Sequence, residues 1–563
     1  MFSRILAASD RVMPAVERRP RLALVVLCLA LWLPGFFTLP PSDRDESRFA
    51  QATRQMLETG DHVRIRYQEE ERNKKPVGIH WLQAVSVRAM QLSQLSSPAE
   101  IWPYRLPSLA GALLAVLATF HWGRVLVGRR PAWLGAAMLG SCLVLVVEAH
   151  IAKTDAALLA SVAAAMGLFG TCYLRPAAFS ARDAAAFWLI LGVAILLKGP
   201  IGPMVALLAG ITLALADRQA PWWRALRPAW GMPLMLAVAM PWLVAIGIAT
   251  EGRFFAQAVG GDMLSKLGSG EEKHWGPPGY YLLTFAVAAF PAAWVVLAAL
   301  PAAWRDRLNP ATRFLLAWVV PGWLLFEAVQ TKLPHYVLPM FPALMLLGAA
   351  WAMDPLRRMP PGWLRWWGLA ALCGTAGGLA LLALALPWRL MVQLLWGGPL
   401  AVLAATMLIW VVLRLRARGA WAGAALDGCV LAVPIYLGVL EGVLPQVKAI
   451  WVSERLALTL RRAAPGLDPA DFGITSYAEP SLVFAIGTAT HLLRTGEDAA
   501  QFLAAGPGRV VAVGDRAEAA FQREVARLGI APREIGLVTG LNYTRGRFLT
   551  LQLYRLAEGG AGS

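Results

Sequence analysis

Charged residues are scarce in this sequence: only 15% of its 563 residues are Asp, Glu, Lys or Arg, whereas 58% are hydrophobic. A soluble domain cannot hide so large a share of apolar surface from water. Internal repeats and low-complexity tracts are also lacking, which excludes solenoids and other repeat architectures. The composition is instead typical of a polytopic α-helical membrane protein.

Cysteine is equally rare. The five cysteines all lie within apolar runs and none belongs to a CxxC pair, so the sequence offers neither a disulfide framework nor a thiolate metal site. Acidic residues are outnumbered, and the formal net charge is +17. The excess Lys and Arg residues lie in short clusters between apolar segments rather than on one basic face, which argues against nucleic-acid binding.

Apolar windows long enough to cross a bilayer recur along most of the chain. We predict about thirteen spans, near residues 22–40, 105–123, 132–149, 156–174, 185–197, 201–216, 229–249, 279–303, 314–330, 335–353, 363–386, 397–413 and 420–440. Arg clusters occupy every second gap, from Arg18 and Arg19 to Arg416 and Arg418. By the positive-inside rule these gaps face the cytoplasm, so the N-terminus is expected inside and the C-terminus outside.

The alternate gaps share the outer face and hold nearly all the unusual polar residues. They contain Asp43-Arg-Asp-Glu-Ser-Arg48, Asn73-Lys-Lys-Pro76, the stretch from Glu148 to Asp155, Lys198, the loop 250–278 and the stretch from Thr331 to Tyr336. Carboxylates and cations crowded against a membrane are costly, so such residues are candidates for a functional site. Phosphate requires Lys or Arg and sugar chemistry requires carboxylates, which predicts a site for an anionic, lipid-linked substrate.

The first outer gap is too long to be a simple connector. Residues 46–60 and 78–93 each place apolar side chains on one helical face, so both are predicted to be helices that lie on the membrane surface. Past residue 444 the composition changes: residues 472–477, 510–513 and 535–538 are typical of short strands and 517–528 of an amphipathic helix. We predict a transmembrane domain of residues 1–444, including the outer loop 41–97, and a compact α/β domain of residues 445–563.

The order of these motifs resembles a known family. A first helix is followed by Asp45-Glu-Ser-Arg48 and by Lys74-Lys-Pro76, each opening a surface helix, and then by Lys153-Thr-Asp155 in the second outer loop. This arrangement resembles the bacterial aminoarabinose (4-amino-4-deoxy-L-arabinose) lipid A transferases, which belong with the protein O-mannosyltransferases in the GT-C superfamily. The likeness covers about the whole chain.

The resemblance implies a fold of about thirteen membrane helices with a small periplasmic C-terminal domain, placed in the bacterial inner membrane. It also implies transfer of a sugar from a polyprenyl phosphate on the periplasmic side, with inversion at the anomeric carbon. The chain departs from the family pattern at Phe49, where Tyr is common, at Gln51, where Glu is common, and at Asn73-Lys-Lys-Pro76, where an aromatic residue and Glu precede Lys-Pro. We expect these departures to bear on the sugar and the acceptor rather than on the reaction type.

Asp45 and Asp155 are the predicted catalytic residues. Asp45 would lie at the reactive end of the sugar, where it orients an acceptor phosphate or acts as a general base toward a hydroxyl acceptor. Asp155 resembles the second acidic position of the superfamily. A carboxylate at a helix start can also serve only as a cap or face solvent, and this alternative stays open for both. Glu148 and His150 are weaker candidates, because a polar pair at a helix end is more often solvated.

Arg48, Lys75, Lys198 and Lys332 are the predicted ligands of the donor phosphate. Each alone could extend toward lipid headgroups. Their concentration in the outer loops, where the positive-inside rule predicts depletion, favours phosphate binding. The resemblance adds Tyr336 as a phosphate contact; its alternative role is that of an interfacial aromatic residue.

A metal site has weaker support in the sequence. Glu271-Glu-Lys-His274 offers side chains that can bind metal, so Glu272 and His274 are the candidates for a divalent ion, with a solvated loop as the alternative. No cofactor is expected to be required.

The sequence therefore predicts a GT-C membrane glycosyltransferase that moves 4-amino-4-deoxy-L-arabinose or a related sugar from undecaprenyl phosphate to lipid A or another envelope acceptor. Its expected partners are this donor, the acceptor glycolipid and membrane lipids, without nucleic acid. A protein O-mannosyltransferase-like enzyme is the nearest alternative, and a polyprenyl-lipid flippase or transporter is an alternative of another class. A transporter should carry polar residues at mid-membrane depth. Here they gather at the outer ends, which favours the enzyme.

Overall fold

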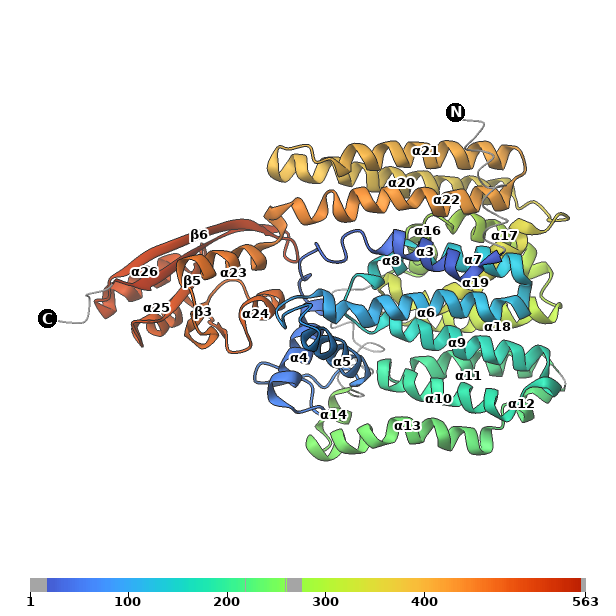
Figure 1. Ribbon diagram of the computed structural model, residues 1–563, viewed down its shortest axis with the longest axis horizontal. Coiled ribbons are helices and arrows are strands. Elements are labelled where there is room, and N and C mark those ends of the chain that lie inside the picture. Colours follow the sequence, from blue (N-terminus) through green and yellow to red (C-terminus); the bar gives the residue numbers. More distant parts are fainter. Residues whose placement is uncertain (1–17, 218, 259, 261–275, 558–563) are drawn as a thin grey trace.

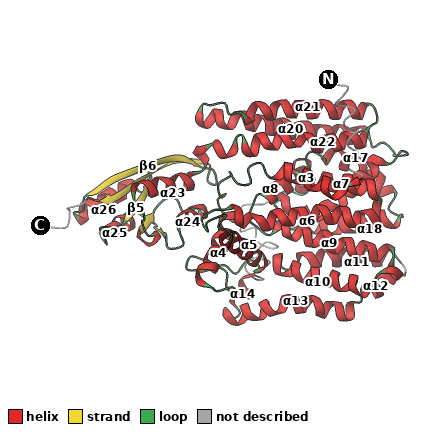
Figure 2. Ribbon diagram, viewed as in Figure 1, coloured by secondary structure: helices red, strands yellow, loops and turns green. Residues whose placement is uncertain are grey.

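The protein consists of a large bundle of helices with a smaller unit at one end. The computed structural model describes residues 18–217, 219–258, 260 and 276–557. The C-terminal unit lies at the left of the bundle in Figure 1, and Figure 2 shows the long strands gathered in it. The helices of the bundle run roughly parallel to the long axis of the molecule (Figure 1).

The bundle is built from helices that are joined by short connections, except for the longer segments between α3 and α6 and between α14 and α16. They are α3 (Pro20–Trp32), α6 (Trp102–Val127), α7 (Arg129–Ser141), α8 (Leu143–Ala149), α9 (Asp155–Leu174), α10 (Ala181–Lys198), α11 (Ile201–Ala216), α12 (Pro221–Ala225), α13 (Pro228–Ala249), α14 (Arg253–Phe255), α16 (Tyr280–Ala288), α17 (Ala293–Arg305), α18 (Pro310–Ala328), η3 (Pro334–Met340), α19 (Phe341–Met353), α20 (Gly362–Met391), α21 (Gly397–Ala417) and α22 (Trp421–Tyr436).

Many of these helices can cross a membrane. In the described part of the chain, eight are long and apolar enough, and a ninth span results if α7 and α8, which meet at an angle of 62°, are counted as one. Three shorter helices, α3, α11 and α17, are also apolar. The chain is thus a multi-span membrane protein, while the count of about thirteen spans stays a prediction.

The structure interrupts three of the predicted spans. The span predicted at 132–149 bends at Cys142, between α7 and α8, and the span predicted at 279–303 is divided into α16 and α17 by a turn around Pro291. Proline lacks a backbone N–H and therefore favours such a break. The first predicted span, 22–40, is helical only as far as Trp32.

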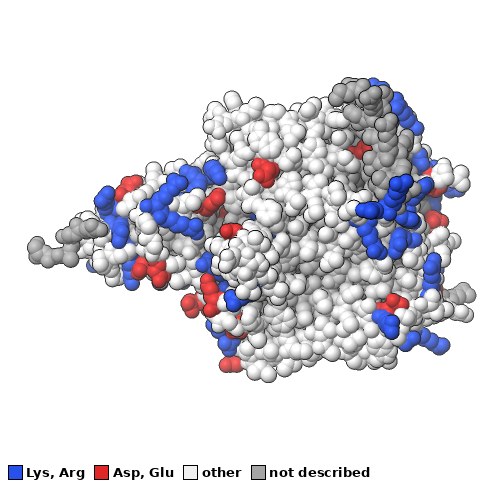
Figure 3. All heavy atoms as spheres, viewed as in Figure 1, with Lys and Arg blue, Asp and Glu red and all other residues white. Residues whose placement is uncertain are grey.

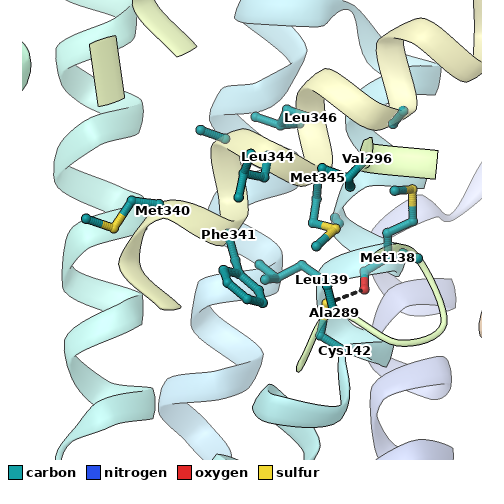
Figure 4. Close-up of a cluster of buried hydrophobic side chains, with 14 of the residues drawn as sticks. Met138, Leu139, Cys142, Ala289, Val296, Met340, Phe341, Leu344, Met345 and Leu346 are labelled. Atoms are coloured by element: carbon teal, nitrogen blue, oxygen red, sulfur yellow. Dashed lines mark hydrogen bonds between the residues drawn. The ribbon is translucent and has the colours of Figure 1, made fainter. Parts of the chain in front are cut away.

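One large core of buried apolar side chains holds the bundle together. Figure 4 shows part of it, where Met138 of α7, Val296 of α17 and Phe341 of α19 lie close to one another. The thiol of Cys142 donates a hydrogen bond to the Met138 carbonyl at 3.2 Å. All five cysteines are free thiols and four of them are buried, as expected for small core residues.

Two glycines permit close approaches that position the outer ends of the helices. A Cβ atom on Gly111 would lie 2.7 Å from the Cα atom of Ala157, so α6 and α9 touch through their backbones. A Cβ atom on Gly78 would lie 2.6 Å from the carbonyl oxygen of Leu196. The outer-loop helix that begins at Gly78 therefore rests on the end of α10, which carries Lys198.

The two helices predicted in the first outer loop are confirmed as α4 (Asp45–Thr59) and α5 (Gly78–Leu92), with a short hairpin of β1 (Arg66–Tyr67) and β2 (Glu70–Glu71) between them. Their apolar faces have different surroundings. Phe49 and Met56 of α4 are buried within the protein, whereas Val85 and Leu92 of α5 are exposed. The expectation that the apolar face of α4 lies on the membrane is therefore wrong, and membrane contact stays a prediction for α5.

The C-terminal unit is a five-stranded sheet with helices on both faces. Its elements are α23 (Val452–Ala463), β3 (Phe472–Ile474), α24 (Pro480–Ile486), β4 (His491–Leu492), α25 (Gly496–Ala504), β5 (Val510–Gly514), α26 (Glu518–Leu528), β6 (Pro532–Asn542) and β7 (Arg547–Leu556). The strand order is β4-β3-β5-β7-β6, with β3 parallel to β4 and β5 and with β7 antiparallel to β5 and β6. Leu456 of α23 packs on one face, and Leu503 of α25 and Phe521 of α26 pack on the other.

The strands and the amphipathic helix predicted in this region are confirmed as β3, β5, part of β6 and α26. Strands β4 and β7 are additions that the sequence did not predict. The boundary between residues 444 and 445 stays a prediction.

Candidate active site

The start of α4 carries the first candidate residues. Asp45 is the first residue of this helix, and its carboxylate lies 3.9 Å from the Arg48 guanidinium. Both side chains are exposed, at 63% for Asp45 and 45% for Arg48. The N-cap position is Arg44, and no side chain caps α4 there. Asp45 is therefore not the N-cap of α4, while its charge in the first turn of the helix is still favourable.

The next residue, Glu46, anchors this segment in the protein. Its carboxylate accepts hydrogen bonds from Arg105 of α6 at 2.7 and 3.2 Å, and from the Ala152 backbone N–H at 3.2 Å. Arg105 also donates to three backbone carbonyls of residues 36–40. Burial alone would raise the pKa of Glu46, but the charge and hydrogen bonds of Arg105 prevail and lower it. A fully satisfied, buried ion pair thus fixes the start of α4 beside the second outer loop.

A second group of charged residues comes together where α8, α9, α10 and η3 meet. Lys153 lies 2.9 Å from Glu148 and 3.6 Å from Asp155. Lys198, the last residue of α10, donates a hydrogen bond to Asp155. The ring nitrogens of His335 lie 3.7 Å from Glu148 and 3.9 Å from Asp155. We call Glu148, Lys153, Asp155, Lys198 and His335 the buried cluster.

Tyr336 borders this cluster. The ammonium of Lys198 lies 5.5 Å from the centre of the Tyr336 ring, within the range of a cation–π contact. The same ring packs edge-on against His335. Lys198 is therefore held between a carboxylate and an aromatic face.

The buried cluster and the outer loop act on each other electrostatically. Burial opposes the charge of Lys153, but Glu148 and Asp155 raise its pKa and keep it protonated, and Asp45 adds to this effect. The charge of Lys75, which precedes α5, acts on His335. Asp45 and Lys75 are thus near enough to the cluster to form one charged region with it.

Lys332 lies in a separate set of contacts. Its ammonium donates to the Gly276 carbonyl at 3.0 Å and lies 3.6 Å from Glu327, which also accepts a hydrogen bond from the Gly279 N–H at 2.8 Å. Across the described residues, no hydrogen bond or ion pair joins Lys332 to the buried cluster. Its role as a phosphate ligand stays a prediction.

The C-terminal unit contacts the loop just before Asp45. The Ser481 hydroxyl donates a hydrogen bond to the Asp43 carboxylate, and the Asp43 N–H donates to the Tyr543 hydroxyl at 2.7 Å. Arg44 donates to the Thr544 carbonyl at 3.2 Å. Burial raises the pKa of Asp43 to about 6, and the charge of Glu479 adds to the rise. The entry to α4 is thereby held from the C-terminal side as well.

Comparisons with known proteins show what the chain as a whole is similar to. No protein-family model matches the chain. An undecaprenyl phosphate-alpha-4-amino-4-deoxy-L-arabinose arabinosyl transferase of Edwardsiella ictaluri (strain 93-146) is 28% identical over 385 residues, which cover 67% of this chain and 66% of the relative. The protein of the same name from Pseudomonas paraeruginosa (strain DSM 24068 / PA7) is 27% identical over 383 residues, covering 66% and 65%. The chain thus spans slightly less than two thirds of these relatives.

Solved structures resemble the protein over nearly its whole length. ArnT from Cupriavidus metallidurans bound to undecaprenyl phosphate superimposes with a TM-score of 0.73 at 19% sequence identity, over 96% of this chain and 99% of ArnT. The chain has the ArnT fold. The apo state of ArnT gives a TM-score of 0.69 at 20% identity. The predicted fold class, a polytopic helical GT-C membrane protein with a C-terminal α/β domain, and the predicted resemblance to aminoarabinose transferases are therefore confirmed.

The structure brings together most of the residues predicted from the sequence. Asp155, Lys198 and Tyr336 meet directly, and Asp45 and Lys75 act on the same cluster. Arg48 is linked to this group of residues through its contact with Asp45. The catalytic and phosphate-binding roles of these residues stay predictions.

Glu148 and His150 differ from the expectation of a solvated pair, because they are only 2% and 5% exposed. Glu148 belongs to the buried cluster. His150 instead faces the backbone carbonyls of Val146 and Pro34, at 2.7 and 2.8 Å from its two ring nitrogens, so its role is structural.

Sequence reasoning did not single out Lys153 and His335 as parts of the site. The Lys-Thr-Asp spacing in the second outer loop was the available signal for Lys153, because it places an ammonium beside the carboxylate that opens α9.

Side chains that could bind a metal ion occur in two parts of the chain. Glu272 and His274 lie outside the described residues. Within the described part of the chain, Glu148, Asp155 and His335 place ligand atoms within 4.8 Å of one another. However, Lys153 and Lys198 pair with the two carboxylates and balance their charge. A divalent ion would compete with these two ammonium groups for the carboxylates, which disfavours a metal site here.

Proposed function

We propose that the protein is a glycosyltransferase that moves a sugar, 4-amino-4-deoxy-L-arabinose or a close relative, from undecaprenyl phosphate to lipid A or another envelope acceptor. The proposal places the reaction at the periplasmic face of a bacterial inner membrane. Support comes from the relatives, which are named for transfer of this sugar from this carrier, and from the ArnT fold.

The observation that carries the proposal is the meeting of the buried cluster with the start of α4. Carboxylates and ammonium groups from four elements converge where helices α8 and α10 end and α9 begins. A lipid-linked sugar phosphate needs cations for its phosphate and a carboxylate at its reactive carbon, and it reaches such a site from the plane of the membrane. Polar groups at helix ends fit this role better than transport across the bilayer, which requires a polar site at mid-depth.

The reaction follows from these groups. The bond between the anomeric carbon and the carrier phosphate breaks, and its electron pair remains on the phosphate oxygen. The acceptor oxygen forms the new bond from the opposite side, which inverts the anomeric carbon. Arg48, Lys75 and Lys198 would stabilise the charge that develops on the departing phosphate.

The role of Asp45 depends on the acceptor. A phosphate on lipid A is already an anion near neutral pH, so Asp45 would only orient it. A hydroxyl acceptor would transfer its proton to Asp45 as the new bond forms. No step requires a metal ion or another cofactor.

Mass spectrometry of lipid A and of total envelope glycolipids tests the proposal in cells with and without the gene. We expect one glycolipid to lose the mass of a sugar residue when the gene is absent and to regain it on complementation. The Glu69→Gln variant is a matched control for site variants, because Glu69 is an exposed carboxylate of the same outer loop. Identical glycolipids in both strains, with no transfer by the purified protein, would reject the proposed activity.

A further inference from the structure

A second charged site lies between two connections at the other end of the helices. The connection from α19 to α20 and the tight turn from α21 to α22 enclose a cavity of about 440 Å³. It is lined by Pro355, Arg357, Met359, Arg365, Arg416, Ala417, Gly419 and Trp421. Helix α22 begins at this cavity and runs toward the C-terminal unit, so the cavity and the candidate active site lie at opposite ends of the bundle (Figure 1).

The lining of the cavity is strongly basic. Three of its residues are arginines and none is acidic. Figure 3 shows Lys and Arg side chains gathered at this end of the bundle, while the middle of the visible face is almost without charge. The positive-inside rule accounts for arginines at helix ends, but it does not require three of them to line one cavity.

One of the three arginines builds the cavity wall. Arg357 donates hydrogen bonds to the Asp354 carbonyl at 2.9 Å and to the Gly419 carbonyl at 2.5 Å. It therefore ties the α19–α20 connection to the α21–α22 turn. These bonds use backbone acceptors and leave the positive charge of Arg357 without a carboxylate partner among the described residues.

The other two arginines have no anionic partner in the described part of the chain. The Arg416 guanidinium lies 5.9 Å from the centre of the Trp421 ring, and neither Arg365 nor Arg416 forms a side-chain hydrogen bond or an ion pair there. Like charges that share a cavity repel each other, and an anion between them would remove that repulsion. A guanidinium pairs with phosphate oxygens through two parallel hydrogen bonds, which makes phosphate a favourable ligand.

The residues that flank the lining arginines in the sequence are suited to lipid. Leu356 is 86% exposed, and Trp363 and Trp366 in the first turns of α20 are 69% and 73% exposed. Exposed Trp side chains at a helix end are typical of the membrane–water interface. A ligand that enters between them would present its charged part to the arginines and its apolar part to the surface of α20.

We propose that this cavity binds the phosphate headgroup of an anionic membrane phospholipid. Arg365 and Arg416 hold the phosphate, Arg357 keeps the two connections together around it, and the acyl chains lie beside Trp363 and Trp366. Basic pockets between membrane helices bind phospholipid headgroups by this chemistry. The site is independent of the proposed transferase activity, because it lies at the other end of the bundle.

Native mass spectrometry of the full-length protein tests the proposal, with phosphatidylglycerol and phosphatidylcholine added to detergent micelles in equal amounts. We expect wild-type protein to retain phosphatidylglycerol preferentially. The Arg365→Gln/Arg416→Gln variant should lose this preference by about tenfold or more, the effect of removing charged hydrogen bonds. Arg414→Gln/Arg418→Gln is the matched control, since it removes two charges from the same end of α21 outside the cavity, and it should retain the preference.

Further outcomes separate the sources of phosphate. A melting curve for each variant shows whether the protein is folded. If the double variant is unfolded, the single variant Arg365→Gln provides a milder test of lipid binding. Equal retention of both lipids by wild-type protein, or undiminished preference in folded double variant, would overturn the proposal. Displacement of phosphatidylglycerol by millimolar inorganic phosphate would overturn the assignment to a lipid and leave a site for free phosphate.

Discussion

At the scale of single residues, the two predicted catalytic carboxylates have opposite surroundings. Asp155 is 6% exposed and is paired with Lys153 and Lys198. The Asp45 side chain is 63% exposed, and its one ion pair within the described part of the chain is with Arg48 at 3.9 Å. A carboxylate that is already neutralised by two ammonium groups is a poor proton acceptor. Asp45 is therefore the better candidate for direct contact with the acceptor, and Asp155 for positioning the lysines.

The Asp45→Asn variant separates catalysis from structure. Asn has nearly the same shape as Asp, and the Asp45 side chain is exposed and is not the N-cap of α4, so the fold should be preserved. Loss of an acid–base or charge-orienting group should lower turnover by about a hundredfold or more. The measurement is a transfer assay on purified protein with a polyprenyl-phosphate sugar and lipid A, accompanied by a melting curve and by the Glu69→Gln control. Turnover close to wild type would move the catalytic assignment away from Asp45.

Lys75 and Lys74 allow a matched test of phosphate binding. Lys75 acts on the buried cluster, whereas its neighbour Lys74 is exposed. Lys75→Ala should weaken binding of undecaprenyl phosphate by about 1.5–3 kcal/mol, the range for a charged hydrogen bond, and Lys74→Ala should leave it nearly unchanged. Binding can be measured by titrating the lipid into detergent-solubilised protein. Equal effects of the two substitutions would indicate a general contribution of charge rather than a phosphate ligand.

At the scale of elements, the start of α4 is fixed from two sides. Glu46 ties it to Arg105 of α6, and Asp43 and Arg44 tie the preceding residues to the C-terminal unit. The backbone of Arg44 has φ 67° and ψ −107°, a conformation that a side chain-bearing residue adopts only at a cost. Contacts on both sides hold this conformation, and it places Asp45 at the first position of the helix.

The pH dependence of stability reports on the contact between Asp43 and the C-terminal unit. The pKa of Asp43 is raised to about 6 by burial and by Glu479, while Arg44 and the Ser481 hydroxyl act in the opposite direction. A carboxyl group with a raised pKa in the folded state stabilises the fold most below its ordinary pKa and loses this contribution as the pH rises through about 6. Asp43→Asn removes the titration, so the variant should gain stability relative to wild type between pH 5 and pH 7.5.

Melting temperatures of wild type, Asp43→Asn and Glu69→Gln at these two pH values provide the measurement. The difference between Asp43→Asn and wild type should grow by about 1 °C from pH 5 to pH 7.5, which corresponds to about 1 kcal/mol in a protein of this size. The exposed Glu69 should show no such change on substitution. A constant difference for Asp43→Asn would mean that Asp43 does not titrate in this contact.

The sequence predicted those elements whose pattern is local. Helices α4 and α5 were predicted to within about one residue because their apolar periodicity and their starting motifs agree. The break between α16 and α17 was missed although Pro291 lies in it, because proline also occurs inside continuous helices such as α13. The bend between α7 and α8 was missed because its apolar run contains no such residue at the bend. Strand β7 was missed although Phe548 to Tyr554 alternates, since its role depends on pairing with both β5 and β6.

The candidate site was predictable only in part. The sequence identified Asp45, Asp155 and Lys198 by their place in the outer gaps. It could not show that Glu148 is buried against Lys153, because this contact requires the chain to turn between α8 and α9. Glu46 lies within the conspicuous Asp45-Glu-Ser-Arg48 motif, yet only the structure shows that its partner is Arg105 and that it anchors the loop.

At the scale of the whole molecule, charge is concentrated at the two ends of an apolar bundle. One end carries the buried cluster and the C-terminal unit, and the other carries the arginine-lined cavity (Figures 1 and 3). Such a distribution fits a protein that works on lipid-linked substrates at one membrane face and is anchored by its arginines at the other. By the positive-inside rule it predicts an orientation with the C-terminal unit in the periplasm.

Labelling with a membrane-impermeant thiol reagent tests this orientation. The native cysteines are a low background, since four are buried and Cys373, the only partly exposed one, can be replaced by Ser. A cysteine in place of the exposed Arg516 of the C-terminal unit should react in intact cells with a permeabilised outer membrane, whereas one in place of the exposed Arg418 should react only after the inner membrane is opened. Ser481 is unsuitable because its hydroxyl is buried against Asp43. Reversed labelling would place the buried cluster on the cytoplasmic side and the arginine clusters on the periplasmic side, contrary to the positive-inside rule. The proposed periplasmic transfer would then have to be abandoned.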